Sequence, residues 1–502
     1  MTPFNPADVD QLRERGISVE EARRQLDLLR VPPPRRRLDR PATVGDGIVR
    51  IPEERTAELI QLAELAARQG RCLKMVPASG AASRMFASLL AARAARQCDV
   101  QDSRVLMERL HDFPFLEELR SELAFEGYDL DILHGAGNCL EILDAMLGPD
   151  GLALADRPKG LLAFHRYAGG ARLAFEEHLV EAAAYARDAD GIARVHFTVS
   201  PEHLDRFREA AEEARPGYER GLGVRLEIGF SVQSPSTDTI AATVDGEPFR
   251  DDAGRVLLRP AGHGALLENL NALEGDLVLL KNIDNVVPDR LKGPTVRWKR
   301  ILCGFLVALQ REVFLHTARL RDPAVEAWAL DEAQAFAAER FAAAAPSGAD
   351  RRAWLLDLLD RPLRVCGVVP NQGEPGGGPF WQRGEDGRVT LQIVETAEVD
   401  LDDPSQASIV AASTHFNPVD LACSVRDVEG RPYDLRRFVD ARAVLVARKS
   451  FGGRELLALE RPGLWNGAMA FWNTVFVEVP VETFAPVKTV FDLLRPEHRG
   501  TV

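Results

Sequence analysis

Residues Arg71–Leu90, RCLKMVPASGAASRMFASLL, give the clearest indication of the fold class of this chain. It begins with a short apolar run, passes through a turn of small residues and continues as a helical segment. A strand, a tight turn and a helix form the opening unit of an α/β fold. The turn at residues 77–84 also presents backbone N–H groups at a helix start, where a phosphate is favoured. The alternative is a plain strand-to-helix turn.

Further apolar runs of strand length alternate with helical segments along the rest of the chain. The expected strands lie at residues 193–199, 224–232, 276–283, 364–369, 389–395, 442–448 and 474–480. Such alternation predicts an α/β protein with a central, mostly parallel or mixed sheet flanked by helices.

Changes in composition and residue pattern along the chain also predict its division into parts. Residues 1–70 are expected to form a helical N-terminal extension, interrupted by a rigid, basic linker at 31–41. Residues 71–496 are expected to form one large α/β domain, followed by a tail at 497–502. Helical insertions are predicted at about 100–157 and 296–360.

Composition excludes several classes of protein. The 502 residues include 62 basic and 76 acidic side chains, and a net charge of −14 argues against a non-specific nucleic-acid binder. The six cysteines contain no CxxC pair, which suggests neither a zinc site nor a disulfide framework. The chain shows no secretory signal and no run of about 18 apolar residues, so we expect a cytoplasmic protein without a membrane span.

Lysine is scarce in this chain. Of the 62 basic residues only seven are lysines, namely Lys74, Lys159, Lys281, Lys292, Lys299, Lys449 and Lys488. Such a ratio usually reflects coding bias, but a lysine retained among arginines can mark a position that needs a compact ammonium group.

Three further motifs are candidates for ligand binding. Gly262-His263-Gly264 forms a turn before a helix, and Lys488 lies in a loop between proline and threonine. Asp284 follows an apolar strand, at the end where open α/β sheets bind ligands and where a carboxylate can hold Mg²⁺. The alternatives are a turn with a surface histidine, which is favoured for this motif alone, a solvated loop lysine, and an Asx turn at Asp284.

The order of these motifs resembles the eukaryotic-type UDP-sugar pyrophosphorylases from about residue 71 to 496. The resemblance rests on the 77–85 turn, PKG at 158–160, FSVQ at 230–233, PAGHGALLENL, NIDN, IVETAEV at 393–399, HFNPVDL at 415–421 and FAPVKTVFDLL. More closely, the chain is identified as a member of a bacterial family, the domain of unknown function 4301 family, by strings such as PASGAASRMF, GHGALLENLN, KNIDNV and PGLWNGAM. The resemblance implies a Rossmann-like, GT-A-like nucleotide-diphospho-sugar transferase fold for residues 71–496.

The resemblance also implies an activity and a set of site residues. The activity would be Mg²⁺-dependent transfer from an NTP, with UTP favoured, to a sugar 1-phosphate, giving an NDP-sugar and pyrophosphate. The partners would be these small molecules, with no nucleic acid and no membrane, and the oligomeric state is left open. The implied residues are Arg84, Lys159 and Lys488 for catalysis; Ser79, Gly80, Ala81, Ser83, Gln233, Gly262, His263 and Gly264 for the nucleotide; Glu395 and Asn417 for the sugar; and Asp284 for the metal.

Two other functions remain as alternatives. Ser79 and Ala82 stand where the pyrophosphorylase pattern has glycine, which keeps open a non-catalytic nucleotide-sugar-binding protein. A metal-dependent hydrolase would use the histidines and glutamates His165, Glu177, His178, Glu181, His196 and His203. Residues 371–379, rich in Gly and Pro, are a candidate sugar-binding segment or lid, and Trp465 and Trp472 are expected in the core.

Overall fold

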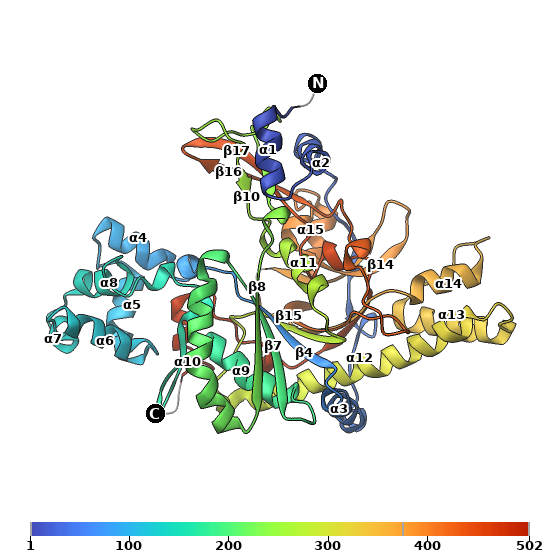
Figure 1. Cartoon of the computed structure of the whole chain (residues 1–502), viewed down its shortest axis with the longest axis horizontal. Coiled ribbons are helices and arrows are strands. Elements are labelled where there is room, and N and C mark those ends of the chain that lie inside the picture. The colour runs from blue at the N-terminus through green and yellow to red at the C-terminus, as the bar shows by residue number, and fades with distance from the viewer. Residues whose placement is uncertain (1–2, 374–375, 500–502) are drawn as a thin grey trace.

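The centre of the protein is a nine-stranded sheet (Figure 1). The computed structural model describes residues 3–373 and 376–499, so part of the predicted tail and two residues of the predicted 371–379 segment lie outside the described residues. The strand order is β2 (Thr43–Val44), β3 (Gly47–Val49), β18 (Asn473–Glu478), β12 (Leu363–Pro370), β15 (His415–Ser424), β11 (Leu277–Lys281), β4 (Cys72–Pro77), β7 (Ile192–Val199) and β8 (Arg225–Val232).

The sheet is mixed but mostly parallel. Strand β15 is antiparallel to both of its neighbours, β12 and β11, whereas the other adjacent pairs are parallel. The parallel strands therefore all end at one edge, which carries the 77–84 turn, Gln233 and Asp284. The α/β fold predicted from the sequence is confirmed, and this edge is where such sheets place ligands.

Two long helices, α3 (Glu53–Arg68) and α12 (Lys292–Arg321), pack together against one face of the sheet. At Gly304 of α12 an added Cβ would overlap the carbonyl of Leu59, so glycine permits the close crossing. Helices α13 (Ala327–Phe341) and α14 (Arg351–Leu359) extend this layer (Figure 1). Among the described residues, Asp289–Arg321 is the one helical segment long and apolar enough to cross a membrane, and 67% of its apolar window is buried inside the protein, as in a core helix.

A second layer covers the β7–β8 end of the sheet. It holds α9 (Ala174–Tyr185), α10 (Leu204–Leu222) and the hairpin β5 (Ala163–Tyr167) and β6 (Gly170–Leu173). A helical lobe projects beside it (Figure 1), made of α4 (Ala87–Ala95), α5 (Gln101–Arg109), α6 (Leu116–Phe125), α7 (Leu130–Gly135) and α8 (Cys139–Leu147). A disulfide joins Cys98 to Cys139 in this lobe, a pair that the spacing of the cysteines did not suggest.

Two smaller sheets complete the fold. One has the order β10 (Leu258–Arg259), β9 (Thr239–Ala242), β17 (Arg454–Glu460) and β16 (Leu445–Phe451), and packs against α1 (Pro6–Glu14) and α2 (Val19–Arg30). The other joins β1 (Arg37–Pro41), β13 (Gly377–Arg383) and β14 (Val389–Glu395), covered by α15 (Pro404–Ala411). The linker predicted at 31–41 is therefore wrong for its second half, because β1 pairs with β13.

The disulfide gives a first prediction. Replacing Cys98 and Cys139 with serine opens a loop of 41 residues in the unfolded chain. We expect the lobe to lose about 2–4 kcal/mol of local stability. Without the crosslink the unfolded lobe regains the conformational entropy of an open loop, which favours unfolding. Hydrogen exchange should quicken in α5–α8 and stay unchanged in β4, β7 and β11. Exchange in the serine variant that quickens further under reducing conditions would contradict this assignment.

Candidate functional site

The centre of the candidate site is one carboxylate held by two lysines. Asp284, 7% exposed, follows strand β11. Its Oδ2 accepts hydrogen bonds from Lys159 Nζ at 3.1 Å and Lys488 Nζ at 3.0 Å. Burial raises the pKa of the Asp284 carboxyl, but the two ammonium groups outweigh burial and hold it below its usual value. We call Asp284, Lys159 and Lys488 the 284 cluster; two cations on one anion give it net positive charge.

Backbone contacts hold the C-terminal segment against the end of β11. Val487 N donates to Asp284 O at 3.0 Å, and Asn285 forms an antiparallel bridge with Pro486. The N–H of Lys488 donates to Asp492 Oδ2 at 2.7 Å, which caps the turn that carries the lysine. The NIDN and APVKT motifs are therefore joined by backbone hydrogen bonds.

The small-residue turn lies beside the same cluster. Lys159 N donates to Gly80 O at 3.0 Å, and Ala81 bridges to Pro158. The Lys159 side chain also donates to Val487 O at 2.9 Å, which joins this turn to the C-terminal segment. Ser83 and Arg84 are exposed, so their side chains are accessible at this edge.

Gln233 connects this turn with the Gly262-His263-Gly264 turn. Its Nε2 donates to Ser79 Oγ at 3.2 Å and lies 3.4 Å from Gly262 O. Gly264 lies so close to Arg461 and Pro462 that an added Cβ would sit 2.8 Å from atoms of each. Most of the residues implied for the nucleotide thus share one region, although their roles stay predictions.

A second cluster surrounds His263. Its ring stacks on Trp465 with centroids 4.3 Å apart, and its Nδ1 accepts the Leu464 N–H at 3.2 Å. Glu395 Oε1 accepts from Trp465 Nε1 at 3.3 Å and lies 3.6 Å from His263 Nε2. Burial lowers the pKa of His263 to about 4 and raises the pKa of Glu395. At neutral pH His263 is therefore uncharged, with its proton on Nε2, facing Glu395.

Trp472 is buried in the core as expected, and Trp465 is half-buried and packs against the same core cluster. Trp465 also belongs to the His263 cluster, because its indole N–H donates to Glu395. Asn417 is buried within β15, where its Oδ1 accepts the N–H of Val419, a residue with φ +59°. This contact gives Asn417 a local role in shaping the strand, and its part in sugar binding stays a prediction.

A buried charge network lies next to β11, and its residues were not recognised as an ion-pair network from the sequence. Glu181 of α9 accepts from Lys74 Nζ and Lys281 Nζ, each at 2.8 Å. Burial lowers the pKa of Lys74 to about 7, while the two ammonium groups overcome the effect of burial and keep the pKa of Glu181 well below its usual value. One turn away, His178 Nε2 lies 3.2 Å from Ile283 O, the carbonyl directly before Asp284. This network thus supports the backbone that presents the 284 cluster.

The same contacts weigh against the hydrolase alternative. No group of three or more His, Cys, Asp or Glu side chains suited to a metal ion occurs in the part of the chain that the structure describes. His165 instead bonds Glu177 at 2.8 Å and His498 at 3.0 Å, and His196 bonds Ser231 Oγ.

Asp284 by itself does not fit a resident magnesium ion. Mg²⁺ takes carboxylates and water oxygens in near-octahedral geometry, and cationic neighbours oppose it. Both lysines occupy the same carboxylate oxygen, Oδ2. The magnesium expected from the sequence therefore stays a prediction for a substrate-bound state.

The fold and this site define an α/β protein with a cationic cluster at the carboxyl edge of its central sheet. The chain belongs to the family described as "Domain of unknown function (DUF4301)", which matches residues 5–499, and the family expected from the sequence is confirmed. No curated protein matches the chain.

Several solved structures are similar over most of the chain. A UDP-N-acetylglucosamine pyrophosphorylase from Trypanosoma brucei is 14% identical, with 98% of this chain and 79% of that chain covered and a TM-score of 0.49. A UDP-glucose phosphorylase from the same organism is 13% identical, covering 98% and 80%, with a TM-score of 0.48. A variant UDP-glucose pyrophosphorylase from Leishmania major with UDP-glucose is 12% identical, covering 98% and 80%, also with a TM-score of 0.48. At these scores the likeness carries no conclusion about activity.

The buried network gives a second prediction. Glu181→Gln leaves two buried ammonium groups without their carboxylate, so we expect the free energy of unfolding to fall by about 3–5 kcal/mol in urea titrations. Glu460→Gln is the control, because its pair with Lys449 is half exposed, and it should cost less than about 1 kcal/mol. Equal losses in the two variants would contradict the assignment.

Proposed function

We propose that the protein is a sugar-1-phosphate nucleotidyltransferase, which joins an NTP, with UTP favoured, to a sugar 1-phosphate. The observation that carries the proposal is the 284 cluster, where two ammonium groups meet one buried carboxylate beside the small-residue turn. The order of motifs along the sequence supports the same assignment. A chain with a net charge of −14 that gathers cations at one sheet edge is suited to bind phosphates there.

The proposed reaction needs positioning and charge neutralisation rather than a nucleophilic side chain. An oxygen of the sugar phosphate forms a bond to the α-phosphorus of the NTP, and the bond from that phosphorus to the bridging oxygen breaks. Pyrophosphate leaves with the electron pair. Lys159 and Lys488 stabilise the negative charge on the transferred and leaving phosphates, and Arg84 adds a third cation at the exposed turn. No general base is required, since the sugar phosphate is already ionised near pH 7.

The two ends of the product are assigned to the other residues of the site. Ser79, Gly80, Ala81 and Ser83 line the turn for the nucleotide phosphates, and Gln233 offers its amide to the base. Glu395 accepts sugar hydroxyls, and the Trp465 ring offers an apolar surface to the sugar. The neutral His263 donates a hydrogen bond from Nε2 without adding charge.

A non-catalytic nucleotide-sugar-binding protein is the second candidate, and one observation favours it. Ala82 N donates to Arg157 O at 3.0 Å, so one N–H of the turn is already used within the protein. A turn with fewer free N–H groups holds phosphate less firmly, which would favour binding over turnover.

The third prediction tests turnover directly. Pooled NTPs and sugar 1-phosphates, analysed by mass spectrometry and pyrophosphate release, should give one NDP-sugar. Lys159→Ala and Lys488→Ala should each lower kcat by about 100-fold or more, because each removes a cation from the transferred phosphates.

Lys449→Ala, which removes a surface lysine of β16, is the matched control and should keep full activity. Melting temperatures of all three variants should stay close to that of the native protein. Full activity in both site variants would refute the site, whereas NDP-sugar binding without pyrophosphate release would favour the second candidate.

The fourth prediction concerns the metal. Because both lysines occupy Asp284 Oδ2, we expect the purified protein to hold no divalent ion, as measured by elemental analysis. Turnover after EDTA treatment should return only with added Mg²⁺ in excess of nucleotide. Stoichiometric zinc in the purified protein would instead favour the hydrolase.

A further inference from the structure

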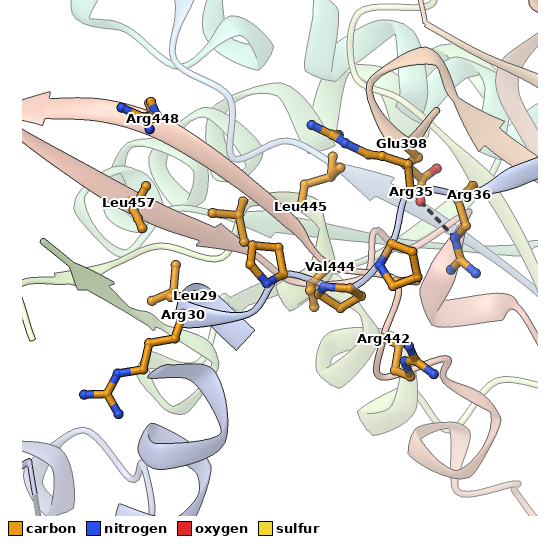
Figure 2. Close-up of a pocket in the computed structure, with 15 residues that line it drawn as sticks. Leu29, Arg30, Arg35, Arg36, Glu398, Arg442, Val444, Leu445, Arg448 and Leu457 are labelled. Carbon is orange, nitrogen blue, oxygen red and sulfur yellow. Dashed lines mark ion pairs between the residues drawn. The ribbon is translucent and has the colours of Figure 1, made fainter. Parts of the chain in front are cut away.

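A cavity of about 370 Å³ lies between the proline segment 32–34 and strand β16 (Figure 2). This volume is within the range of small-molecule sites. Its walls come from the segments 29–36 and 442–448, together with Glu398 and Leu457. None of the predicted site residues lines this cavity, so it is separate from the 284 cluster and from His263.

The wall is cationic, and one of its five arginines has no carboxylate partner among the residues that the structure describes. Four of the five arginines pair with acids: Arg30 with Glu247, Arg36 with Asp440, Arg442 with Glu385 and Arg448 with Glu455. Among the described residues, the partner of the Arg35 guanidinium is instead a backbone carbonyl, that of Ala397. In Figure 2 Arg35 extends towards Leu445, whereas Arg30 and Arg442 point outward.

The rest of the wall is apolar. Three consecutive prolines, residues 32–34, line it together with residues 443–446. Leu29, Val444, Leu445 and Leu457 also lie along its wall (Figure 2). Proline rings and branched side chains suit an apolar body, and they are already fixed, so ordering them costs little entropy. The cavity thus combines an apolar floor with an uncompensated guanidinium.

We propose that this cavity binds a small phosphomonoester with a compact apolar ring. A phosphate dianion matches the guanidinium of Arg35 by charge-assisted, bidentate hydrogen bonds. Arg448 also lines the cavity, but its pair with Glu455 makes it the weaker of the two cations. The ring lies against the prolines and Val446. The carboxylate of Glu398 at one end disfavours a phosphate there and so sets the direction of the ligand.

Glu398 is also the wall between this cavity and the His263 cluster. Buried to 4% exposure, it accepts from Asn466 Nδ2 at 3.0 Å and from Glu395 N at 2.8 Å. On its other side Arg36 Nε lies 3.8 Å from Oε1, and Arg36 N donates to Glu398 O at 2.8 Å. Arg35, which donates to Ala397 O, and Arg36 therefore both contact the 397–398 segment that follows Glu395.

The test measures binding rather than activity, so it does not depend on the proposed function. Phenyl phosphate, titrated into the full chain by calorimetry, should bind with a dissociation constant of about 1 mM or below, and phenol should bind at least tenfold more weakly. Arg35→Gln should weaken phenyl phosphate binding about tenfold or more, since one charge-assisted pair is lost. Arg448→Gln should weaken it to a smaller extent. Arg37→Gln, an exposed arginine of the same segment outside the cavity, should change it less than twofold.

Two further readouts locate the ligand. Hydrogen exchange at residues 395–399 should slow with phenyl phosphate in the native protein and not in Arg35→Gln. Lys488→Ala should bind the probe as the native protein does. The proposal would be overturned if phenyl phosphate did not bind, if Arg37→Gln weakened its binding as much as Arg35→Gln, or if Lys488→Ala weakened its binding. The last result would place the anion at the 284 cluster and leave the proposed function standing.

Discussion

The rest of the site depends on the pairing of one buried carboxylate with two ammonium groups. Asp284 lies at the end of a strand buried on both faces, where an unpaired charge would be too costly to keep. Lys159 arrives on a turn and Lys488 on the C-terminal segment, 125 and 204 residues away along the chain. Because both lysines donate to this one carboxylate, the pairing joins three distant segments at one edge of the sheet.

A second layer of charge lies behind this edge. Glu181 gathers Lys74 and Lys281 from two adjacent strands, and His178 on the same helix bonds the carbonyl before Asp284. Buried ion pairs add little net stability, since desolvation offsets much of their attraction. Their contribution here is to fix the arrangement: helix α9 has one position at which both lysines are satisfied, and in that position it also holds the backbone at residue 283.

Local sequence patterns predicted the individual strands, turns and helices, but they did not predict contacts between residues far apart in the chain. The strand, turn and helix at 71–90 and the strand runs are confirmed because periodicity and turn residues act over short distances. The β1–β13 pair joins residues more than 300 apart, so nothing within 31–41 reveals it. The order of motifs put Asp284, Lys159 and Lys488 in one site, and their side chains meet there, although their roles stay predictions. Trp465 packs against the core as expected, but its contacts with His263 and Glu395 join segments far apart in sequence, so no local pattern reveals them.

The scarcity of lysine in the sequence acquires a physical explanation in the charge networks. Lys449 forms an ion pair with Glu460 on the surface. The ammonium groups of the other six lysines form ion pairs with the carboxylates of Glu181, Asp284, Glu177 or Asp420. Two ammonium groups can share one carboxylate oxygen, as they do at Asp284, because each is a compact charge on a flexible stem. Two planar guanidinium forks would each compete for both oxygens and would crowd one another. Lysine is therefore the cation that can neutralise this carboxylate in pairs and still turn towards a phosphate when one arrives.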